Sequence, residues 1–507
     1  MKLIRLFYVL YKIKLLSPKG LYHLFKSIFT CGINLMALLH FAEKKFTHKI
    51  ALVDDIETLT YKQLLEQSTM LARSLVEVTQ LRPGMKVGVL CRNHASLVKT
   101  IFAVSRVGAD IYLLNTEISK QQFDDFTERH HFNLVIYDHG LSPIVQNYSN
   151  QKILSYHSDL PAISNSLLVK ENQAILPRTS TGKLVLQTSG TTGLSKDVAH
   201  KPSLFHYLNP FVAFIKRLRI LNYRNAYIAT PIFHGYGIAV LLLFIPLGRK
   251  VVITNGFNAK HACNLIQRYQ IEVVTVVPLM LKKMLQMNAE YLMSLKCIAS
   301  GGARLPSKLV KETFQRLGPV LYNLYGTSET GLNFIATPRD LIYSATTIGK
   351  KIAGLKISIL DENKEEVSPG TFGQLCIKSD WSIRKHAWIE TGDAGYQDEN
   401  GYYFLGGRID EMVVSGGENV YPIEIEQVLI KHPQIHDVAV IGVYDDLFGQ
   451  RLKAFVVPET NEVLTEEEVI AWLRPRVARF QLPKMIKIVE NLPYTPLGKL
   501  DKKQLSR

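Results

Sequence analysis

A short segment rich in hydroxyl groups and glycine, TSGTTGLSK, has the composition of a phosphate-binding loop. Its hydroxyls can donate hydrogen bonds, its glycines let backbone amides turn toward an anion, and its lysine adds a positive charge. It is not a Walker A loop, which needs its lysine directly after a glycine. The composition therefore favours a phosphate site, with an ordinary Ser/Thr-rich turn as the alternative. The residues are Thr188, Ser189, Gly190, Thr191, Thr192, Gly193 and Lys196.

Asp197 directly follows this lysine and argues against a phosphate site. A carboxylate about 5–6 Å from a phosphate would repel it by up to a few kcal/mol at an effective dielectric of about 20. The cost would be small if Asp197 pointed outward or paired with Lys196. The segment alone leaves both possibilities open.

Five further segments, together with TSGTTGLSK, resemble the adenylate-forming superfamily in their order and approximate spacing. This superfamily contains acyl-CoA synthetases, firefly luciferase and the adenylation domains of peptide synthetases. The resemblance covers about residues 30 to 507, and the chain looks most like the fatty-acid–CoA ligases. The segments are PIFHGYG (231–237), YGTSET (325–330), TGD (391–393), GGRIDEMVVSGGENVYPIEIE (406–426) and LPYTPLGKL (492–500).

The resemblance implies a reaction in two steps. A carboxylate attacks the α-phosphate of ATP to give an acyl-adenylate and pyrophosphate, and a thiol, usually of coenzyme A, then takes the acyl group. ATP, Mg²⁺ and coenzyme A are therefore the expected cofactors and co-substrates. Because an anion attacks a polyanion in the first step, positive charge and hydrogen-bond donors must be concentrated at the site.

The resemblance also implies a role for each matching residue around the nucleotide. Loop 188–196 would hold the β- and γ-phosphates, and Ser328 would lie beside the α-phosphate, where the family mostly has threonine. Glu329 would bind Mg²⁺, which bridges phosphate oxygens. Tyr325 would stack on adenine, and Asp393 would bond the ribose hydroxyls. The remaining nucleotide contacts would come from Gly301, Gly302, Ala303, Gly326 and Arg408.

The acid and the thiol have their own matching residues. His234 resembles the family's gate beside the substrate carboxylate, although a histidine in an apolar run is by itself more often part of the core. Lys499 matches the catalytic lysine of adenylation, and Lys196 supplies a second positive charge. Asp410 matches the hinge about which the C-terminal domain swings between the two steps. That swing would bring Ser415, Gly416 and Gly417 to the thiol tunnel.

Three departures from the family pattern are visible. The family's Pro-Lys-Gly is Ser195-Lys196-Asp197 in this chain, residues 379–390 form a shorter stretch than usual, and Gln481 replaces a common lysine. These departures leave room for a catalytically weakened nucleotide-binding homologue. The apolar segment after His234 has no acidic residue to pair with an ammonium group, so it suits an acyl chain better than an amino acid, although a buried helix explains the same apolarity.

The elements that must position these residues are α/β. A chain of 507 residues exceeds a single core, which stops growing near about 250–300 residues. Strands and helices alternate through most of the sequence, which predicts mostly parallel sheets covered by helices. Short alternating strands from 349 to 404 predict a small, distorted β-barrel. We expect a basic extension (1–29), an AMP-binding N-terminal domain of two α/β layered subdomains plus the barrel (30–408), and a mobile α+β C-terminal lid domain (409–507).

The charge is concentrated at the N-terminus. The net charge is +16, and residues 1–50 hold nine Lys/Arg against the single acid Glu43. Uncharged runs there are too short or too polar for a signal peptide or a membrane span. Residues 1–25 therefore predict either a helix that touches a membrane surface peripherally or a helix packed on its own domain. We expect no nucleic-acid partner.

Five cysteines lie far apart without a CxxC pair, which predicts buried free thiols in a reducing cytosol. Taken together, these features predict an ATP-dependent acid–CoA ligase in the cytoplasm, with peripheral contact at the inner face of the membrane as an open possibility. A medium- or long-chain fatty acid is the leading substrate. The alternatives are an aryl acid such as succinylbenzoate and transfer to the phosphopantetheine of a carrier protein.

Overall fold

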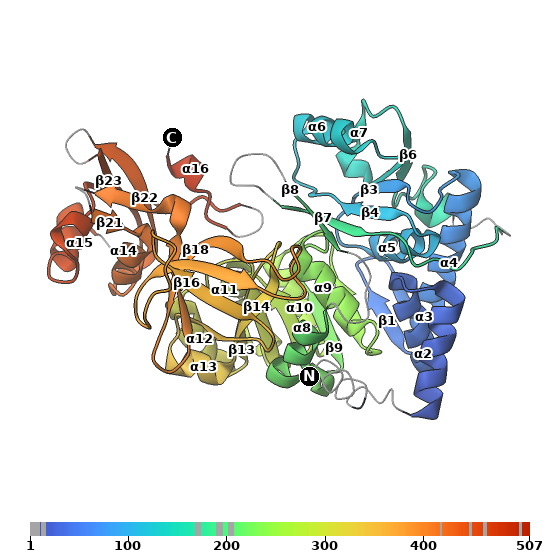
Figure 1. The fold of residues 1–507 in the computed structure, drawn as a ribbon, viewed down its shortest axis with the longest axis horizontal. Coiled ribbons are helices and arrows are strands. Elements are labelled where there is room, and N and C mark those ends of the chain that lie inside the picture. Colours follow the sequence, from blue (N-terminus) through green and yellow to red (C-terminus); the bar gives the residue numbers. More distant parts are fainter. Residues whose placement is uncertain are drawn as a thin grey trace.

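Three β-sheets carry the fold in the computed structural model of this chain. The structure describes residues 11, 17–167, 174–188, 196–200, 207–415, 418–445, 449–459, 464–495 and 499–506. Figure 1 shows the six-stranded sheet and its helices at one end of the long axis and the C-terminal unit at the other. Within the described ranges, no helix is long and apolar enough to cross a bilayer.

The six-stranded sheet has the order β6-β5-β3-β4-β7-β8, and all of its pairs are parallel except β7–β8. Helix α5 (Ala95–Val107) joins β3 to β4, is buried along its whole length, and ends at Gly108, as predicted. The strands are β3 (Lys86–Leu90), β4 (Asp110–Leu113), β5 (Leu134–Tyr137), β6 (Gln151–Leu154), β7 (Leu184–Thr188) and β8 (Lys196–His200), with helices α6 (Lys120–His130) and α7 (Ser142–Val145).

The largest sheet has thirteen strands and a parallel centre. Because its parallel strands alternate with helices, the segments that follow β9, β12 and β13 meet at one edge of the sheet. These segments carry His234, the Gly301–Ala303 turn and Glu329. The parallel strands are β1 (Ile50–Val53), β9 (Asn225–Ile228), β10 (Lys250–Ile253), β11 (Val273–Val276), β12 (Cys297–Gly301) and β13 (Leu321–Thr327), with helices α8 (Leu208–Ala213), α9 (Gly235–Phe244), α10 (Ala259–Tyr269), α11 (Pro278–Leu285) and α12 (Ser307–Leu317).

The segment predicted as a small barrel is an antiparallel extension of this sheet. Pairing continues from β14 through β15 to β19, β18, β17 and β16, and the described edge strand β16 has β17 as its one strand partner. This extension places Asp393 of β18 opposite Arg408 of β19. The elements are β14 (Gly331–Ala336), α13 (Pro338–Tyr343), β15 (Thr347–Lys351), β16 (Lys356–Leu360), β17 (Gly373–Lys378), β18 (Ile389–Gln397) and β19 (Tyr403–Arg408).

The C-terminal residues form a compact α+β unit with an apolar core of its own, as the sequence predicts. Its sheet has the order β21-β20-β23-β22, and β24 pairs in parallel with β23. The elements are β20 (Val413–Ser415), β21 (Glu418–Val420), α14 (Pro422–Leu429), β22 (Ile435–Asp445), β23 (Gly449–Pro458), α15 (Glu466–Leu473), β24 (Met485–Ile488) and α16 (Lys502–Leu505).

The N-terminal helices lie at the outer edge of the molecule (Figure 1). Helix α2 (Pro18–Cys31) packs on α3 (Leu35–Phe46), which in turn packs on α5 and on α4 (Tyr61–Val78). The predicted hairpin before α4 is formed by β1 and β2 (Thr58–Thr60). All five cysteines are buried and free, in agreement with the prediction. Residues 1–10 and 12–16 of the predicted extension lie outside the described residues.

Candidate functional site

The predicted phosphate loop is the turn of the β7–β8 hairpin. Ser189, Gly190, Thr191, Thr192 and Gly193 lie outside the described residues. The strands on either side are described, and in their antiparallel register Thr188 stands opposite Lys196 and Gln187 opposite Asp197.

Gln187, opposite Asp197, contacts the segment that follows the neighbouring strand. The Gln187 Oε1 accepts a hydrogen bond from the backbone N–H of Asn115, at 3.3 Å, in the segment that follows β4. The two arrangements of the Asp197 carboxylate that the sequence left open both stay predictions.

His234 stands at the start of α9, in the segment that follows β9. Its Nε2 is buried and has no hydrogen-bond partner among the described residues. Burial, together with the smaller effect of the positive charge of Lys499, lowers the pKa of His234 to about 4. The imidazole is therefore neutral at physiological pH and leaves one ring nitrogen available to a ligand.

A buried asparagine holds the segment that carries His234. The Asn93 side-chain amide donates to the Thr230 carbonyl oxygen at 3.0 Å, and its oxygen accepts from the Ile232 N–H at 2.8 Å. Asn93 follows β3, so this side chain joins the six-stranded sheet to the largest sheet. The segment also turns tightly, because a Cβ at Gly237 would lie 2.2 Å from the Pro231 carbonyl oxygen.

Lys499 reaches this site from the C-terminal unit. The Thr495 N–H donates to the Lys499 carbonyl oxygen at 2.7 Å, and Tyr494 forms an antiparallel bridge with Leu500. The hairpin that carries Lys499 is thus formed, although its residues 496–498 lie outside the described residues. After burial, the positive charge of Lys499 is the second cause that lowers the pKa of His234, so the two residues lie within electrostatic reach of each other.

Ion pairs between the C-terminal unit and the largest sheet hold this arrangement. Lys282 of α11 lies 3.7 Å from Asp437 of β22, and Arg304 lies 3.6 Å from Glu426 of α14. Lys308 of α12 pairs with Glu459, which follows β23. These contacts fix the C-terminal unit in the position that places Lys499 beside His234.

The predicted ribose site is a chain of hydrogen bonds. The Tyr325 hydroxyl donates to Asp393, and the Arg408 guanidinium lies 3.3 Å from the other oxygen of the same carboxylate. Burial raises the pKa of Asp393, and both partners oppose this rise. Arg408 also donates to Asp410 at 3.1 Å. The carboxylate therefore faces donors on two sides and lies beside the ring predicted to stack on adenine.

At the ends of β12 and β13, at the same edge of the largest sheet, the backbone turns at glycine residues. Gly302 has a φ of +78°. At Gly326 a Cβ would lie 2.3 Å from the Gly331 carbonyl oxygen, so the turn that precedes Glu329 requires glycine. The Ser300 hydroxyl is buried without a hydrogen-bond partner among the described residues. Ala303 continues this turn, as predicted.

Two residues at the end of β13 fit the predicted magnesium site. The Ser328 side chain is exposed, and Glu329 is partly exposed. No hydrogen bond or ion pair to the Glu329 carboxylate occurs among the described residues, whereas its backbone carbonyl accepts from Ile383. A carboxylate with both oxygens available and a nearby hydroxyl suits a hard cation such as Mg²⁺.

Of the residues predicted for the thiol tunnel, the structure describes Ser415. Ser415 is buried, and its hydroxyl donates to the Phe480 carbonyl oxygen inside the C-terminal unit, at 3.0 Å. Gly416 and Gly417 lie outside the described residues. Their role after a domain swing, and that of Asp410 as the hinge, stay predictions.

Tyr236 is a site residue that the sequence analysis did not single out. Its hydroxyl donates to the Ala299 carbonyl oxygen at 2.7 Å. A Cβ at Gly301 would lie 3.5 Å from the Tyr236 ring. The ring thus fills the space between the start of α9 and the end of β12, two residues beyond His234. Two features of the sequence could have identified the site residues that were missed. Tyr236 belongs to the PIFHGYG segment, and Asn93 follows a buried parallel strand.

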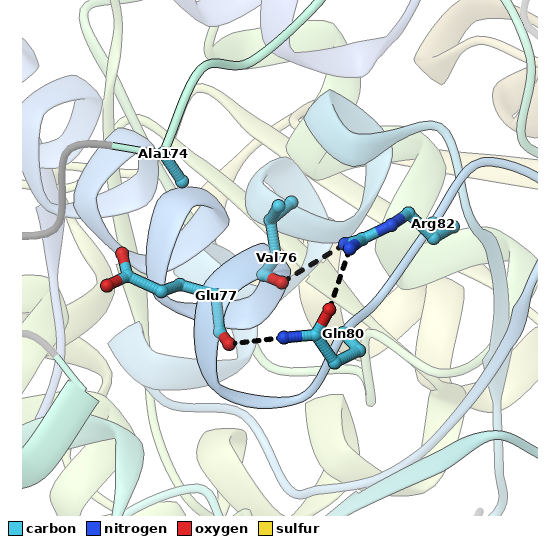
Figure 2. Close-up of a pocket in the computed structure, with 5 residues that line it drawn as sticks. All are labelled: Val76, Glu77, Gln80, Arg82 and Ala174. Atoms are coloured by element: carbon cyan, nitrogen blue, oxygen red, sulfur yellow. Dashed lines mark hydrogen bonds between the residues drawn. The ribbon is translucent and has the colours of Figure 1, made fainter.

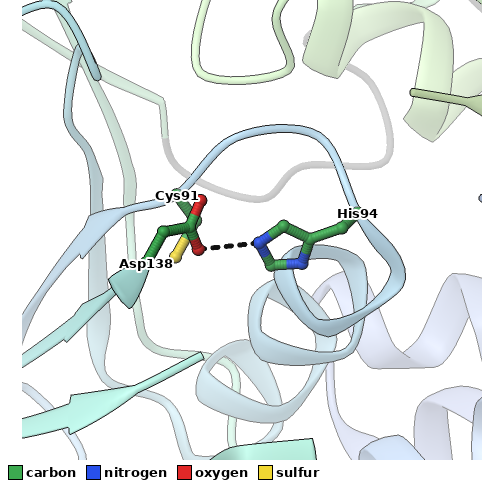
Figure 3. A group of neighbouring side chains, drawn as sticks. All are labelled: Cys91, His94 and Asp138. Carbon is green, nitrogen blue, oxygen red and sulfur yellow. Dashed lines mark hydrogen bonds and ion pairs between the residues drawn. The ribbon is translucent and has the colours of Figure 1, made fainter. Parts of the chain in front are cut away.

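A second group of polar side chains contains Cys91, His94 and Asp138 (Figure 3). The His94 Nδ1 accepts from the Leu97 N–H at 3.1 Å, so its Nε2 carries the proton and donates to Asp138 at 2.8 Å. A metal ion on Nε2 would remove that proton and leave an imidazolate. The hydrogen bonds therefore favour a structural cap at the start of α5 over a metal site.

A hollow at the end of α4 contains none of the predicted site residues (Figure 2). Its Arg82 donates to the Val76 carbonyl oxygen at 3.1 Å and to Gln80 at 2.7 Å. The guanidinium is committed to these local bonds, which close the end of the helix. The hollow has no evident part in the reaction.

Comparisons with known proteins agree with this geometry. The AMP-binding enzyme family matches residues 39–385, and the AMP-binding enzyme C-terminal domain matches residues 424–499. The 2-succinylbenzoate–CoA ligase of Bacillus pumilus is 27% identical over 90% of this chain and 94% of its own length. The fatty acid–[acyl-carrier-protein] ligase ScoC of Streptomyces coeruleorubidus is 27% identical over 88% of this chain and 91% of its own length.

Solved structures show the same fold. The o-succinylbenzoate coenzyme A synthetase of Bacillus subtilis, in complex with ATP and magnesium, aligns with a TM-score of 0.81 and 24% identity over 93% of this chain and 99% of that one. The amide bond synthetase McbA of Marinactinospora thermotolerans aligns with a TM-score of 0.83 and 22% identity over 93% and 99% of the two chains.

Proposed function

The chain belongs to the AMP-binding enzyme family, and we propose that it is an ATP-dependent acid–CoA ligase for a compact aryl carboxylic acid of the 2-succinylbenzoate class. The reaction uses ATP, Mg²⁺ and coenzyme A. The observation that carries the proposal is the buried, unpartnered Nε2 of His234 at the start of α9, within electrostatic reach of Lys499.

In the first step an oxygen of the acid attacks the α-phosphorus of ATP, and the bond from that phosphorus to the leaving pyrophosphate breaks. Lys499 would offset the negative charge gathered between the carboxylate and the α-phosphate. The unpartnered Nε2 of His234 would orient the acid, which a neutral imidazole can do without giving up a proton. Glu329 would hold Mg²⁺, which draws charge from the phosphate oxygens.

In the second step the thiol sulfur attacks the acyl carbon of the adenylate. A C–S bond forms, the C–O bond to the phosphate breaks, AMP leaves, and the thiol proton is released. Lys499 must first leave the site if the thiol is to approach from the same side. The ion pairs of Lys282, Arg304 and Lys308 with the C-terminal unit would therefore have to open between the two steps.

We propose that Tyr236 limits the size of the acid. The ring lies against Gly301 and is held by its hydrogen bond to Ala299. In that position it would obstruct a long acyl chain that continues beyond His234. This supports an aryl acid in place of the medium- or long-chain fatty acid that the apolar sequence after His234 favoured. The buried residues of α9 are explained by core packing, which was the alternative interpretation of that apolarity.

The named relatives support the same choice. Among them, several Bacillus proteins are 2-succinylbenzoate–CoA ligases, at 26–29% identity. One is a fatty acid–[acyl-carrier-protein] ligase, so a fatty acid and a carrier-protein acceptor are the alternatives to be tested.

Pyrophosphate release, measured with ATP, Mg²⁺ and either coenzyme A or a carrier protein, distinguishes these substrates. We expect release with 2-succinylbenzoate or a related aryl acid and little with medium- and long-chain fatty acids. The Tyr236→Ala enzyme should accept longer acids while keeping the aryl acid. Release restricted to fatty acids in the unchanged enzyme would refute the aryl-acid proposal. Nucleotide binding without release, for every acid, would favour the weakened homologue.

The predicted membrane contact of residues 1–25 is separate from this reaction and stays a prediction. Residues 1–10 and 12–16 lie outside the described residues, so the contact can be assessed on α2 alone.

A further inference from the structure

Helix α2 exposes three large aromatic side chains on one face. Tyr22 is 59% exposed, Phe25 67% and Phe29 75%, although rings of this size are normally covered in a folded chain. At 3.6 residues per turn, these rings fall within an arc of about 60° around the helix axis. The three rings, which we term the α2 face, therefore form a continuous apolar stripe that no described segment covers.

The opposite side of α2 is the side that packs on the protein. Gly20, Ser27 and Cys31 are buried there, and the Ser27 hydroxyl bonds to the His40 ring of α3 at 2.8 Å. The end of the helix is fixed, because the Thr179 N–H donates to the Cys31 carbonyl oxygen at 3.2 Å. The exposure of the α2 face thus does not come from a loosely attached helix.

Cations border this apolar stripe. Lys26 places its ammonium 5.6 Å from the centre of the Tyr22 ring, and the Arg178 guanidinium lies 5.9 Å from the centre of the Phe29 ring. Lys19 is exposed one turn before Tyr22. With Lys19 and Lys26 included, the combined aromatic and basic surface spans an arc of about 120°.

Acidic groups do not balance these cations. Helix α2 contains no Asp or Glu, and the single acid of residues 1–50, Glu43, lies 2.8 Å from the ammonium of Lys44. Lys19, Lys26 and Lys44 all act to lower the pKa of His23, which burial also lowers, against the opposing effect of Glu43 alone. The local potential around α2 is therefore positive.

We propose that the α2 face docks on the surface of an anionic lipid bilayer. Aromatic side chains favour the interface between lipid headgroups and acyl chains, and neighbouring lysines are attracted to anionic headgroups. Charge complementarity favours this partner over a second copy of the chain, whose α2 would carry the same positive charge. Figure 1 shows α2 at the outer edge of the molecule, at the end of the long axis away from the C-terminal unit, where a flat surface can approach it.

Co-sedimentation of the full chain with vesicles tests this proposal. We expect binding to vesicles of phosphatidylglycerol and phosphatidylcholine, weaker binding to phosphatidylcholine alone, and weakening by salt. Phe25→Ser/Phe29→Ser should reduce binding at least about tenfold. Lys19→Gln/Lys26→Gln should reduce it roughly 25-fold on anionic vesicles, at about fivefold for each lysine.

A matched control replaces apolar side chains that are equally exposed elsewhere. Met293 is 65% exposed and Ile342 68%, so Met293→Ser/Ile342→Ser should bind vesicles as the unchanged chain does. All variants should release pyrophosphate normally with a soluble acid, which shows that they are folded.

Four results would overturn the proposal. The unchanged chain could fail to bind anionic vesicles, or it could bind neutral vesicles equally well. The Phe25→Ser/Phe29→Ser variant could keep full binding, which would assign docking to another part of the chain, such as residues 1–16 with their four basic residues. The unchanged chain could also form a dimer that only this variant loses, and bind no vesicles. The α2 face would then contact a second copy of the chain.

Discussion

Lys499 of the C-terminal unit lies close enough to His234 of α9 to lower the pKa of its imidazole, although 265 positions separate the two residues in the sequence. This is the arrangement that the proposed adenylation step needs. Three ion pairs, of Lys282, Arg304 and Lys308, join the C-terminal unit to the largest sheet in the same structure.

Lys499→Ala should abolish the first half-reaction selectively. Removing the charge that offsets the crowded phosphate and carboxylate should lower adenylation by at least about a hundredfold. Transfer from a supplied acyl-adenylate to coenzyme A should be nearly unchanged, because Lys499 must leave the site for that step. Pyrophosphate release and thioester formation, measured separately, check this. Equal loss of both half-reactions in folded protein would contradict the two-position role.

His234 should make the stability of the protein depend on pH. Its pKa in the folded state is about 4, below the ordinary value of 6.5, so the unfolded chain binds a proton first as the pH falls. The contribution of neutral His234 to the free energy of unfolding is fully present above about pH 6.5. It is lost progressively between about pH 6.5 and 4, by up to roughly 3 kcal/mol. Urea unfolding across this range should show a smaller loss in His234→Gln. An equal loss in both proteins would show that His234 is not buried in its neutral form.

Asn93→Ala should impair catalysis through the position of His234. The substitution leaves the Thr230 carbonyl and the Ile232 N–H without their partner, which costs about 1–3 kcal/mol of stability. The displaced His234 segment should lower kcat roughly ten- to a hundredfold while the KM for ATP changes little.

Asn133→Ala is the matched control for Asn93. The Asn133 side chain accepts from the Lys86 N–H at 2.9 Å, at the opposite end of β3, and does not touch the His234 segment. It should destabilise the protein without a comparable fall in kcat. If the two variants lose kcat equally, the role of Asn93 is structural only.

Asp197→Gly should change the adenylation rate by less than about threefold. We expect the carboxylate to point outward or to pair with Lys196, so that its charge is screened from the phosphates. Single-turnover pyrophosphate release measures this effect. A rise of more than about a hundredfold would show that the carboxylate faces the phosphates and that the natural chain is a weakened enzyme.

Much of this fold follows from local pattern. The capping box of Thr60 and Gln63, the apolar periodicity of α4 and the stop of α5 at Gly108 all act within a few residues, so the sequence displays them directly. The motif order likewise identified the residues that meet at the carboxyl edge of the largest sheet.

The contacts that arise from tertiary packing could not be predicted in this way. Asn93 bonds to backbone groups that lie more than 130 residues away, and Tyr236 bonds to a carbonyl on another strand. The pairing of Gln187 with Asp197 depends on the register of β7 and β8. None of these relationships produces a periodic pattern of residues in the sequence.

Arg408 belongs to two sites at once. It pairs with Asp393 in the predicted ribose site and donates to Asp410 at the predicted hinge. If both predicted roles hold, a nucleotide that changes the hydrogen bonds of Asp393 would also change the bond from Arg408 to Asp410. Thermodynamic linkage would make this influence reciprocal: the free energy that the bound nucleotide contributes to one domain orientation would return as affinity of that orientation for the nucleotide. The shared guanidinium would thus couple nucleotide binding to the orientation of the C-terminal domain.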